Sequence, residues 1–225
     1  MGIRTKLTNE IELILDIMRN NGTISKKQVY FILKNIMGKS EQFIETNISV
    51  IYTGKRIIEI EDDGIIYYNL NTPEKSQLIN YESVLILWGI LDTITYGDPE
   101  GITSEDRAAA IAALSTLREK KSPFTSSYIF KNVIYNTAFI NTSQPATMIF
   151  IADEYQQKMK QYNGVDIYYH LVFKSAGEDA DNKIIDRISK FELDKKLPHA
   201  LQFVTQESDT ANAIVRIIEV EPAEE

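Results

Sequence analysis

Apolar residues recur with a helical period three times in the N-terminal part of the chain. In the first segment they follow the i, i+3, i+4, i+7 spacing that gathers side chains on one face of a helix. Its apolar positions are Ile11, Ile14, Leu15 and Met18. The same spacing returns over residues 29–36, and residues 44–51 repeat its i, i+4 and i+7 positions. Ser25 and Ser40 precede these segments, where a hydroxyl can cap free backbone N–H groups. The pattern predicts three short helices, of which the first two, with matching apolar faces and a short connection, should pack on each other.

After the third segment the period changes from helical to alternating. The alternating apolar and acidic residues are Ile58, Glu59, Ile60 and Glu61. The dipeptide Asp63–Gly64 follows, and it supplies the positive φ angles that a tight hairpin turn requires. Residues 57–68 are therefore predicted to form a two-stranded hairpin, with Ile65 and Tyr67 on its inner face.

Two further helices are predicted in the middle of the chain. Residues 81–94 are strongly apolar and indicate a buried helix, with Trp88 in the core. A second helix starts at Ser104 and two acidic residues, is rich in alanine, and is expected to run to about residue 120. Ser122–Pro123 should end it.

Beyond Pro123 the chain contains short runs rich in β-branched and aromatic residues, which predict strands. These runs are residues 128–135, 147–152, 166–173, 200–205 and 213–220. Helical segments are expected between some of them, at residues 153–161 and 181–192. Strands that alternate with helices favour a mixed sheet that is at least partly parallel.

Together the elements predict an α+β or α/β protein with two folded parts. Residues 1–72 would form a helical domain with a hairpin, residues 73–122 a helical connector, and residues 123–225 an α/β domain with a mixed sheet. A chain of 225 residues is long enough for two modest domains.

Composition excludes several kinds of site. The chain has no cysteine, so disulfides, thiolate zinc sites and a cysteine nucleophile are excluded. No apolar run has the length of a membrane span, and the first residues lack the apolar core of a signal peptide. We expect a cytoplasmic protein with no membrane partner.

The net charge of −8 argues against indiscriminate coating of nucleic acid, which needs a broad basic field. The charge is unevenly distributed. Residues 1–72 contain six Lys and three Arg against six Glu and three Asp, a balance of zero, so the whole surplus lies in residues 73–225. A basic face is therefore expected only in the first segment.

The order helix, helix, helix, hairpin over residues 9–70 resembles the winged-helix domain, a helix-turn-helix variant found in many DNA-binding proteins. The resemblance implies that the third helix enters the major groove and that neighbouring turns contact phosphates. The residues it assigns to base edges are Gln42, Glu45, Thr46 and Ser49. Those it assigns to phosphates are Lys26, Lys27, Lys55 and Arg56.

The charges of this segment also support a different interpretation. The third helix carries Glu41 and Glu45 and no central Lys or Arg, and the tip of the hairpin, residues 59–63, is acidic where a DNA-contacting wing is usually basic. Carboxylates repel phosphate, so a winged helix used for protein contacts remains an alternative.

The second half carries no complete catalytic motif. A restriction-type nuclease needs a carboxylate two residues before a Lys, with a further acid on the neighbouring strand. Asp153 and Lys174 end two predicted strands, but Val172 occupies the carboxylate position, so at most a nuclease-like fold without its chemistry is expected. The only histidines are His170 and His199, and His170 is expected to pack within its strand. We expect no enzyme, no cofactor and no metal.

The layout of a winged helix before an α/β domain weakly resembles replication-relaxation and mobilisation accessory proteins of bacterial mobile elements. That resemblance implies a DNA-binding accessory or regulatory protein, with duplex DNA as partner and a symmetric homodimer. The alternative is a protein-interaction scaffold, in which the acidic C-terminal domain binds a protein partner.

Overall fold

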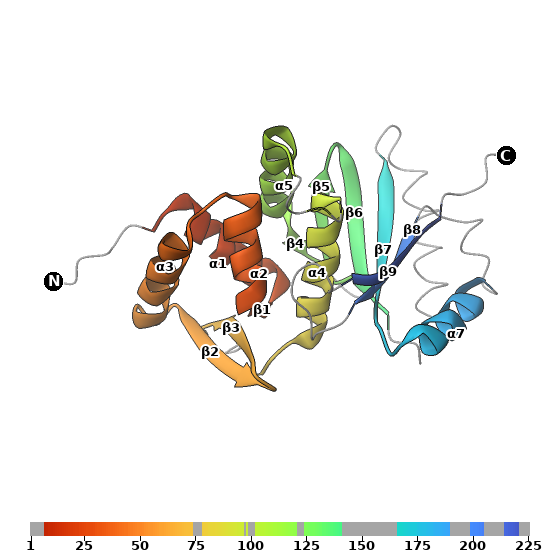
Figure 1. The fold of residues 1–225 in the computed structure, drawn as a ribbon, viewed down its shortest axis with the longest axis horizontal. Coiled ribbons are helices and arrows are strands. Elements are labelled where there is room, and N and C mark those ends of the chain that lie inside the picture. Colours follow the sequence, from red (N-terminus) through yellow and green to blue (C-terminus); the bar gives the residue numbers. More distant parts are fainter. Residues whose placement is uncertain are drawn as a thin grey trace.

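The computed structural model describes residues 7–73, 78–96, 98, 102–120, 124–140, 166–189, 199–204 and 214–220. Within these residues the chain is layered (Figure 1). The N-terminal helices and a small sheet lie on one side, helices α4 and α5 follow, and a larger sheet separates α4 from helix α7. The predicted fold class, mixed helices and strands with a mixed C-terminal sheet, is confirmed.

The three N-terminal helices form where the apolar period predicted them. They are α1 (Asn9–Asn21), α2 (Lys26–Tyr30) with its π-helical continuation η1 (Phe31–Ile36), and α3 (Glu41–Thr53). The backbone N–H of Phe43 donates to the hydroxyl of Ser40, as predicted for the cap of α3. The apolar faces of all three helices are buried in one core, and α3 contacts η1.

The start of α2 is fixed by a capping box. The backbone N–H of Gln28 donates to the Ser25 hydroxyl, and the Gln28 side chain accepts from the Ser25 N–H. Gln28 is fully buried, and its Nε2 also donates to the Val84 carbonyl oxygen at 2.7 Å. One side chain therefore both begins α2 and joins it to α4 (Tyr81–Thr95).

The predicted hairpin consists of β2 (Ile57–Asp62) and β3 (Ile65–Leu70), and a strand that the sequence did not predict, β1 (Ile24–Ser25), completes the sheet. Its order is β1-β3-β2, with both pairs antiparallel. Tyr67 is buried as predicted, but Tyr68 on the opposite face of β3 is buried as well, because α1 and α2 also contact β3.

Helix α4 is the predicted buried helix, and it contacts β1 on one side and β6, β7 and β8 on the other. The prediction for the next helix was wrong at its end. Helix α5 spans Ser104–Thr116, and the chain leaves it at Leu117 to form β4 (Arg118–Glu119). Arg118 and Glu119 pair with Ser127 and Ser126, so strand pairing at the sheet edge ends the helix before Pro123.

The larger sheet has the order β4-β5-β6-β7-β8-β9. Its longer strands are β5 (Ser126–Phe130), β6 (Val133–Phe139), β7 (Ile167–Lys174), β8 (His199–Val204) and β9 (Ile214–Val220). Strands β6, β7 and β8 are parallel, which confirms the predicted partly parallel sheet, and the outer pairs are antiparallel.

The structure contains two strands where the sequence predicted one, at residues 128–135. Lys131 and Asn132 have φ angles of 46° and 67°, and they form a two-residue turn that divides residues 128–135 between β5 and β6. The helix expected at residues 181–192 is α7 (Glu178–Ser189). The strand predicted at residues 147–152 and the helix at 153–161 lie outside the described residues.

A single apolar core runs from α1 through α4 to one face of the larger sheet. Trp88 is 3% exposed within it and meets the Phe31 ring edge-on, with centroids 5.8 Å apart. A second core fills the space between the other sheet face and α7, and it contains Tyr169. The core positions predicted for Trp88 and Tyr67 are confirmed, and α4 joins the N-terminal helices to the sheet.

Candidate nucleic-acid interface

The outward face of α3 is polar from Glu41 to Ser49. Ile44, Ile48 and Ile51 are buried, so the helical period turns the intervening positions to solvent. The four residues assigned to base edges are all exposed: Gln42, Glu45, Thr46 and Ser49. The structure therefore brings them together on one accessible helix face.

The two carboxylates of α3 have different surroundings. Lys34 Nζ lies 2.6 Å from Glu41 Oε1, and this bond holds the pKa of the Glu41 carboxyl below its ordinary value. Burial, followed by the charges of Glu59 and Glu45, raises the pKa of Tyr68. Glu45 of α3 therefore lies close enough to β3 for its charge to act on Tyr68, together with the charge of Glu59.

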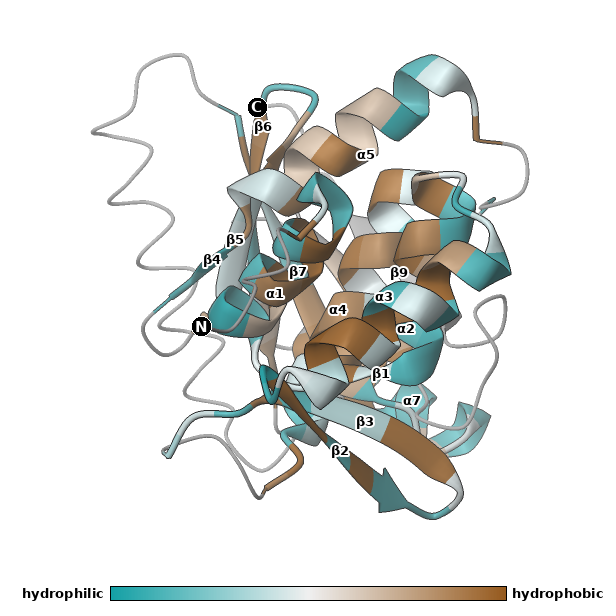
Figure 2. Cartoon of the chain, turned by 90° about the vertical axis from the view of Figure 1, so that its left-hand side faces the viewer, coloured by the Kyte–Doolittle hydropathy of each residue, from teal (hydrophilic) through white to brown (hydrophobic). Residues whose placement is uncertain are grey.

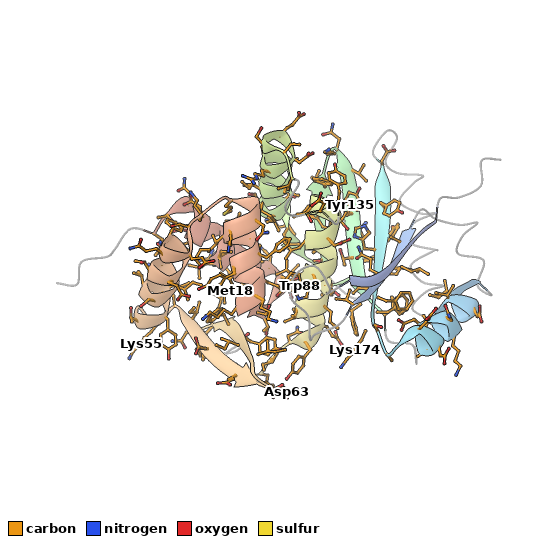
Figure 3. All side chains as sticks on the ribbon, viewed as in Figure 1. Met18, Lys55, Asp63, Trp88, Tyr135 and Lys174 are labelled. Atoms are coloured by element: carbon orange, nitrogen blue, oxygen red, sulfur yellow. The ribbon has the colours of Figure 1, made fainter. Side chains whose placement is uncertain are left out.

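The four basic residues assigned to phosphates fall into two groups. Lys55 and Arg56 are exposed in the turn between α3 and β2, and Lys55 has a φ angle of 54°. Lys26 and Lys27 begin α2, and they lie with Gly64 at the turn end of the hairpin. Figure 3 shows Lys55 and Asp63 at opposite ends of the hairpin, which β2 spans over roughly 20 Å. The structure does not gather the four residues at one place.

The hairpin turn is acidic and is attached to α4. Glu59, Glu61, Asp62 and Asp63 are exposed. Tyr81 at the start of α4 donates its hydroxyl to Asp62 Oδ2 at 2.5 Å, and its ring meets that of Tyr67 edge-on at 5.9 Å. The bond to Asp62 raises the pKa of Tyr81 to about 12. This end of the hairpin is therefore held toward the central helix.

Two exposed features of this region were not predicted. The first is Tyr52 at the end of α3, which is 51% exposed. The sequence contained a signal for it, because a residue three positions after Ser49 lies on the same side of the helix. The second feature is a groove of about 460 Å³ between the flank of α2–η1 and the turn end of β3. Its apolar floor includes Phe31, and Lys34 stands at its rim. The local sequence gives no signal for it, because its two sides are about thirty residues apart.

The polar residues of the second half do not assemble a catalytic site within the described residues. Asp166 precedes β7 and Lys174 ends it, so the length of the strand, roughly 26 Å, separates them. Val172 is fully buried between them. Asp153 lies outside the described residues. Among those described, no group of three or more His, Asp or Glu residues is placed to hold a metal ion.

His170 packs inside the sheet, as predicted. It is 2% exposed, and the Tyr128 hydroxyl lies 3.2 Å from its Nδ1. Burial lowers the pKa of His170 to about 3, so the imidazole is neutral at ordinary pH. Its surroundings are those of a core residue within an aromatic cluster that includes Tyr135 and Tyr168.

No helix of the described chain is long and apolar enough to cross a membrane. In comparisons of the whole sequence, no protein-family model matches it, and no curated protein matches it significantly.

Proposed function

We propose that residues 7–73 form a winged helix that binds duplex DNA, and that the protein is a non-enzymatic regulatory or accessory factor. Helix α3 would enter the major groove, where side-chain amides and hydroxyls can reach base edges. A role in a bacterial mobile element and a symmetric dimer on paired half-sites stay predictions of the resemblance.

The observation that supports DNA binding most is the exposed polar face of α3. Gln42, Thr46 and Ser49 offer amide and hydroxyl groups at the helical spacing, and none is buried by the rest of the described chain. The N-terminal carboxylate of this face, that of Glu41, is paired with Lys34. The repulsion of phosphate at this end of α3 is thereby reduced.

The test is a fluorescence-anisotropy titration of labelled mixed duplex DNA at several salt concentrations. We expect affinity to fall steeply with salt, because phosphate contacts release counterions. Replacing Lys26, Lys55 and Arg56 together with alanine should reduce the slope of log affinity against log salt by about 2–3, since each phosphate contact contributes about 0.9.

A matched control removes the same charge elsewhere. Lys120, Lys174 and Lys183 are exposed and lie outside the N-terminal helices and hairpin. Replacing these three with alanine changes the net charge equally and should leave the salt slope near that of the parent. If the two triple variants behave alike, or if the first retains full affinity, DNA binding by this face is wrong.

A second candidate function, protein binding, is favoured by the hairpin. Its exposed carboxylates, including Glu59 and Glu61, form an acidic strand that would repel phosphate and suits a basic protein surface. The same titration discriminates the two functions, because failure to bind DNA at low salt would favour the protein-binding function. Light scattering of the purified protein measures the predicted dimer.

A further inference from the structure

The groove beside α2 combines an apolar floor with a basic rim. The described residues that line it are Lys26, Lys27, Tyr30, Phe31, Lys34, Asn35, Gly64, Ile65 and Ile66. They include three lysines and no carboxylate, in a protein whose net charge is −8. Its volume of about 460 Å³ lies within the range of ligand-binding clefts, roughly 300–1,000 Å³.

The groove exists because the chain leaves the edge of β3 early. Strand β1 pairs only with Tyr68 and Tyr67, and the capping box at Ser25 then turns the chain into α2. The next two residues of β3, Ile66 and Ile65, pair with β2 on one edge, whereas β1 does not extend along the other. Figure 2 shows this apolar end of β3 beside the polar end of β2.

The mouth of the groove is open at its turn end. Gly64 has a φ angle of 73°, and a β-carbon built there would meet nothing within 4 Å. The floor is held in place by packing, because Phe31 is 4% exposed and its ring meets that of Trp88 of α4 edge-on. Ile65 and Ile66 are only half-buried, so part of their apolar surface remains available to a ligand.

We propose that this groove binds an extended peptide segment of a partner protein in which acidic and apolar residues alternate. In an extended chain successive side chains point to opposite sides, so apolar side chains can cover Ile65 and Ile66 while carboxylates stay in water. Lysine ammonium groups on long, flexible stems can reach those carboxylates.

A nucleic-acid backbone fits the groove less well, because phosphates and sugars offer little apolar surface for Phe31, Ile65 and Ile66. Lys34 already bonds to Glu41 at 2.6 Å, so a ligand carboxylate would compete with Glu41 for its ammonium group. Lys26 stands over the Tyr30 ring at 5.7 Å, which holds a second charge beside the floor. The proposal does not depend on DNA binding by α3.

The experiment measures anisotropy of a fluorescein-labelled peptide of alternating aspartate and leucine with the full-length protein. The parent should bind, and a peptide with asparagine in place of aspartate should bind about tenfold more weakly, because the lysines then lose their charged partners. Ile65→Ala should weaken binding of the aspartate peptide about tenfold by removing apolar contact from the floor.

Ile58→Ala is the matched control, because Ile58 is half-buried on β2 and does not line the groove. It should keep parent affinity. Failure of the parent to bind, equal loss in both alanine variants, or equal binding of the asparagine peptide would overturn the proposal. So would Ile65→Ala weakening duplex DNA and peptide alike, since the groove would then be a nucleic-acid contact.

Discussion

Replacing Gly89 with alanine tests whether α4 needs a glycine where it crosses the larger sheet. A β-carbon at this position would overlap Oε1 of Gln202, and it would lie 3.3 Å from Cδ of that residue and 3.5 Å from Cγ2 of Val172. Gln202 is 1% exposed, and its Nε2 donates to the Gly89 carbonyl oxygen at 3.3 Å and to Thr93 Oγ1 at 3.2 Å. The amide cannot move away without breaking these bonds.

The expected free-energy change combines opposing contributions. Alanine is favoured over glycine inside a helix by about 1 kcal/mol. Overpacking a well-filled interface costs about 1–3 kcal/mol, and a buried amide that loses its partners costs about 1–3 kcal/mol more. Because the two costs arise from one displacement and are not fully additive, we expect Gly89→Ala to lower the free energy of unfolding by about 1–3 kcal/mol.

Urea denaturation followed by fluorescence provides the measurement. Trp88 is the only tryptophan, and it is buried on α4 next to Gly89. The control is a double-mutant cycle with Gln202→Ala, which removes the overlapping side chain. The double variant should be more stable than the sum of the two single losses predicts. If Gly89→Ala equals or exceeds the parent in stability, the proposed close contact is wrong.

Three further variants test the polar contacts. Tyr81→Phe removes the hydroxyl bond to Asp62, so it should cost about 0.5–1.5 kcal/mol and speed amide exchange at the hairpin turn, as read by NMR; unchanged exchange would contradict the attachment to α4. Burial raises the pKa of Asp92 from 3.8 to about 6, so this group lowers the free energy of unfolding as pH rises from about 4 to 6. Asp92→Asn should remove that loss, and urea titrations at neutral pH should show a gain of about 1–2 kcal/mol. Absence of a gain would contradict the burial of Asp92. Burial lowers the pKa of His170 from 6.5 to about 3, so the dependence on pH has the opposite sign, and the free energy of unfolding falls as pH falls between these values. His170→Gln should reduce this loss of stability in acid. An unchanged loss would show that His170 is not its source.

Local patterns in the sequence were sufficient to predict most helices and the hairpin of the N-terminal half. The apolar period predicted α1, α2–η1 and α3, and the hydroxyls of Ser25 and Ser40 begin two of them as expected. Asp63–Gly64 predicted the hairpin turn, where both residues have positive φ angles. These features are set by contacts within a few residues, so a window of sequence contains their cause.

The predictions from the sequence were wrong where residues far apart in the chain determine the local structure. The sequence placed one strand at residues 128–135, and it extended α5 through residues that pair with β5 instead. Lys131 and Asn132 lack the glycine that marks most two-residue turns, so the reversal between β5 and β6 had only a weak local signal. Pairing across the sheet overrides local propensity in both cases.

The sequence by itself determined that Gln42, Glu45, Thr46 and Ser49 face solvent, because the buried stripe of α3 fixes its opposite face. It also predicted that His170 would be buried in its strand. Only the tertiary structure decided that Lys26 and Lys27 lie at the turn end of the hairpin, and that Tyr81 holds this end near α4. The groove has the same origin, since it forms between segments that become neighbours only when β3 packs beside α2. Helical period is a property of successive residues, whereas a groove is a property of surfaces that folding brings together.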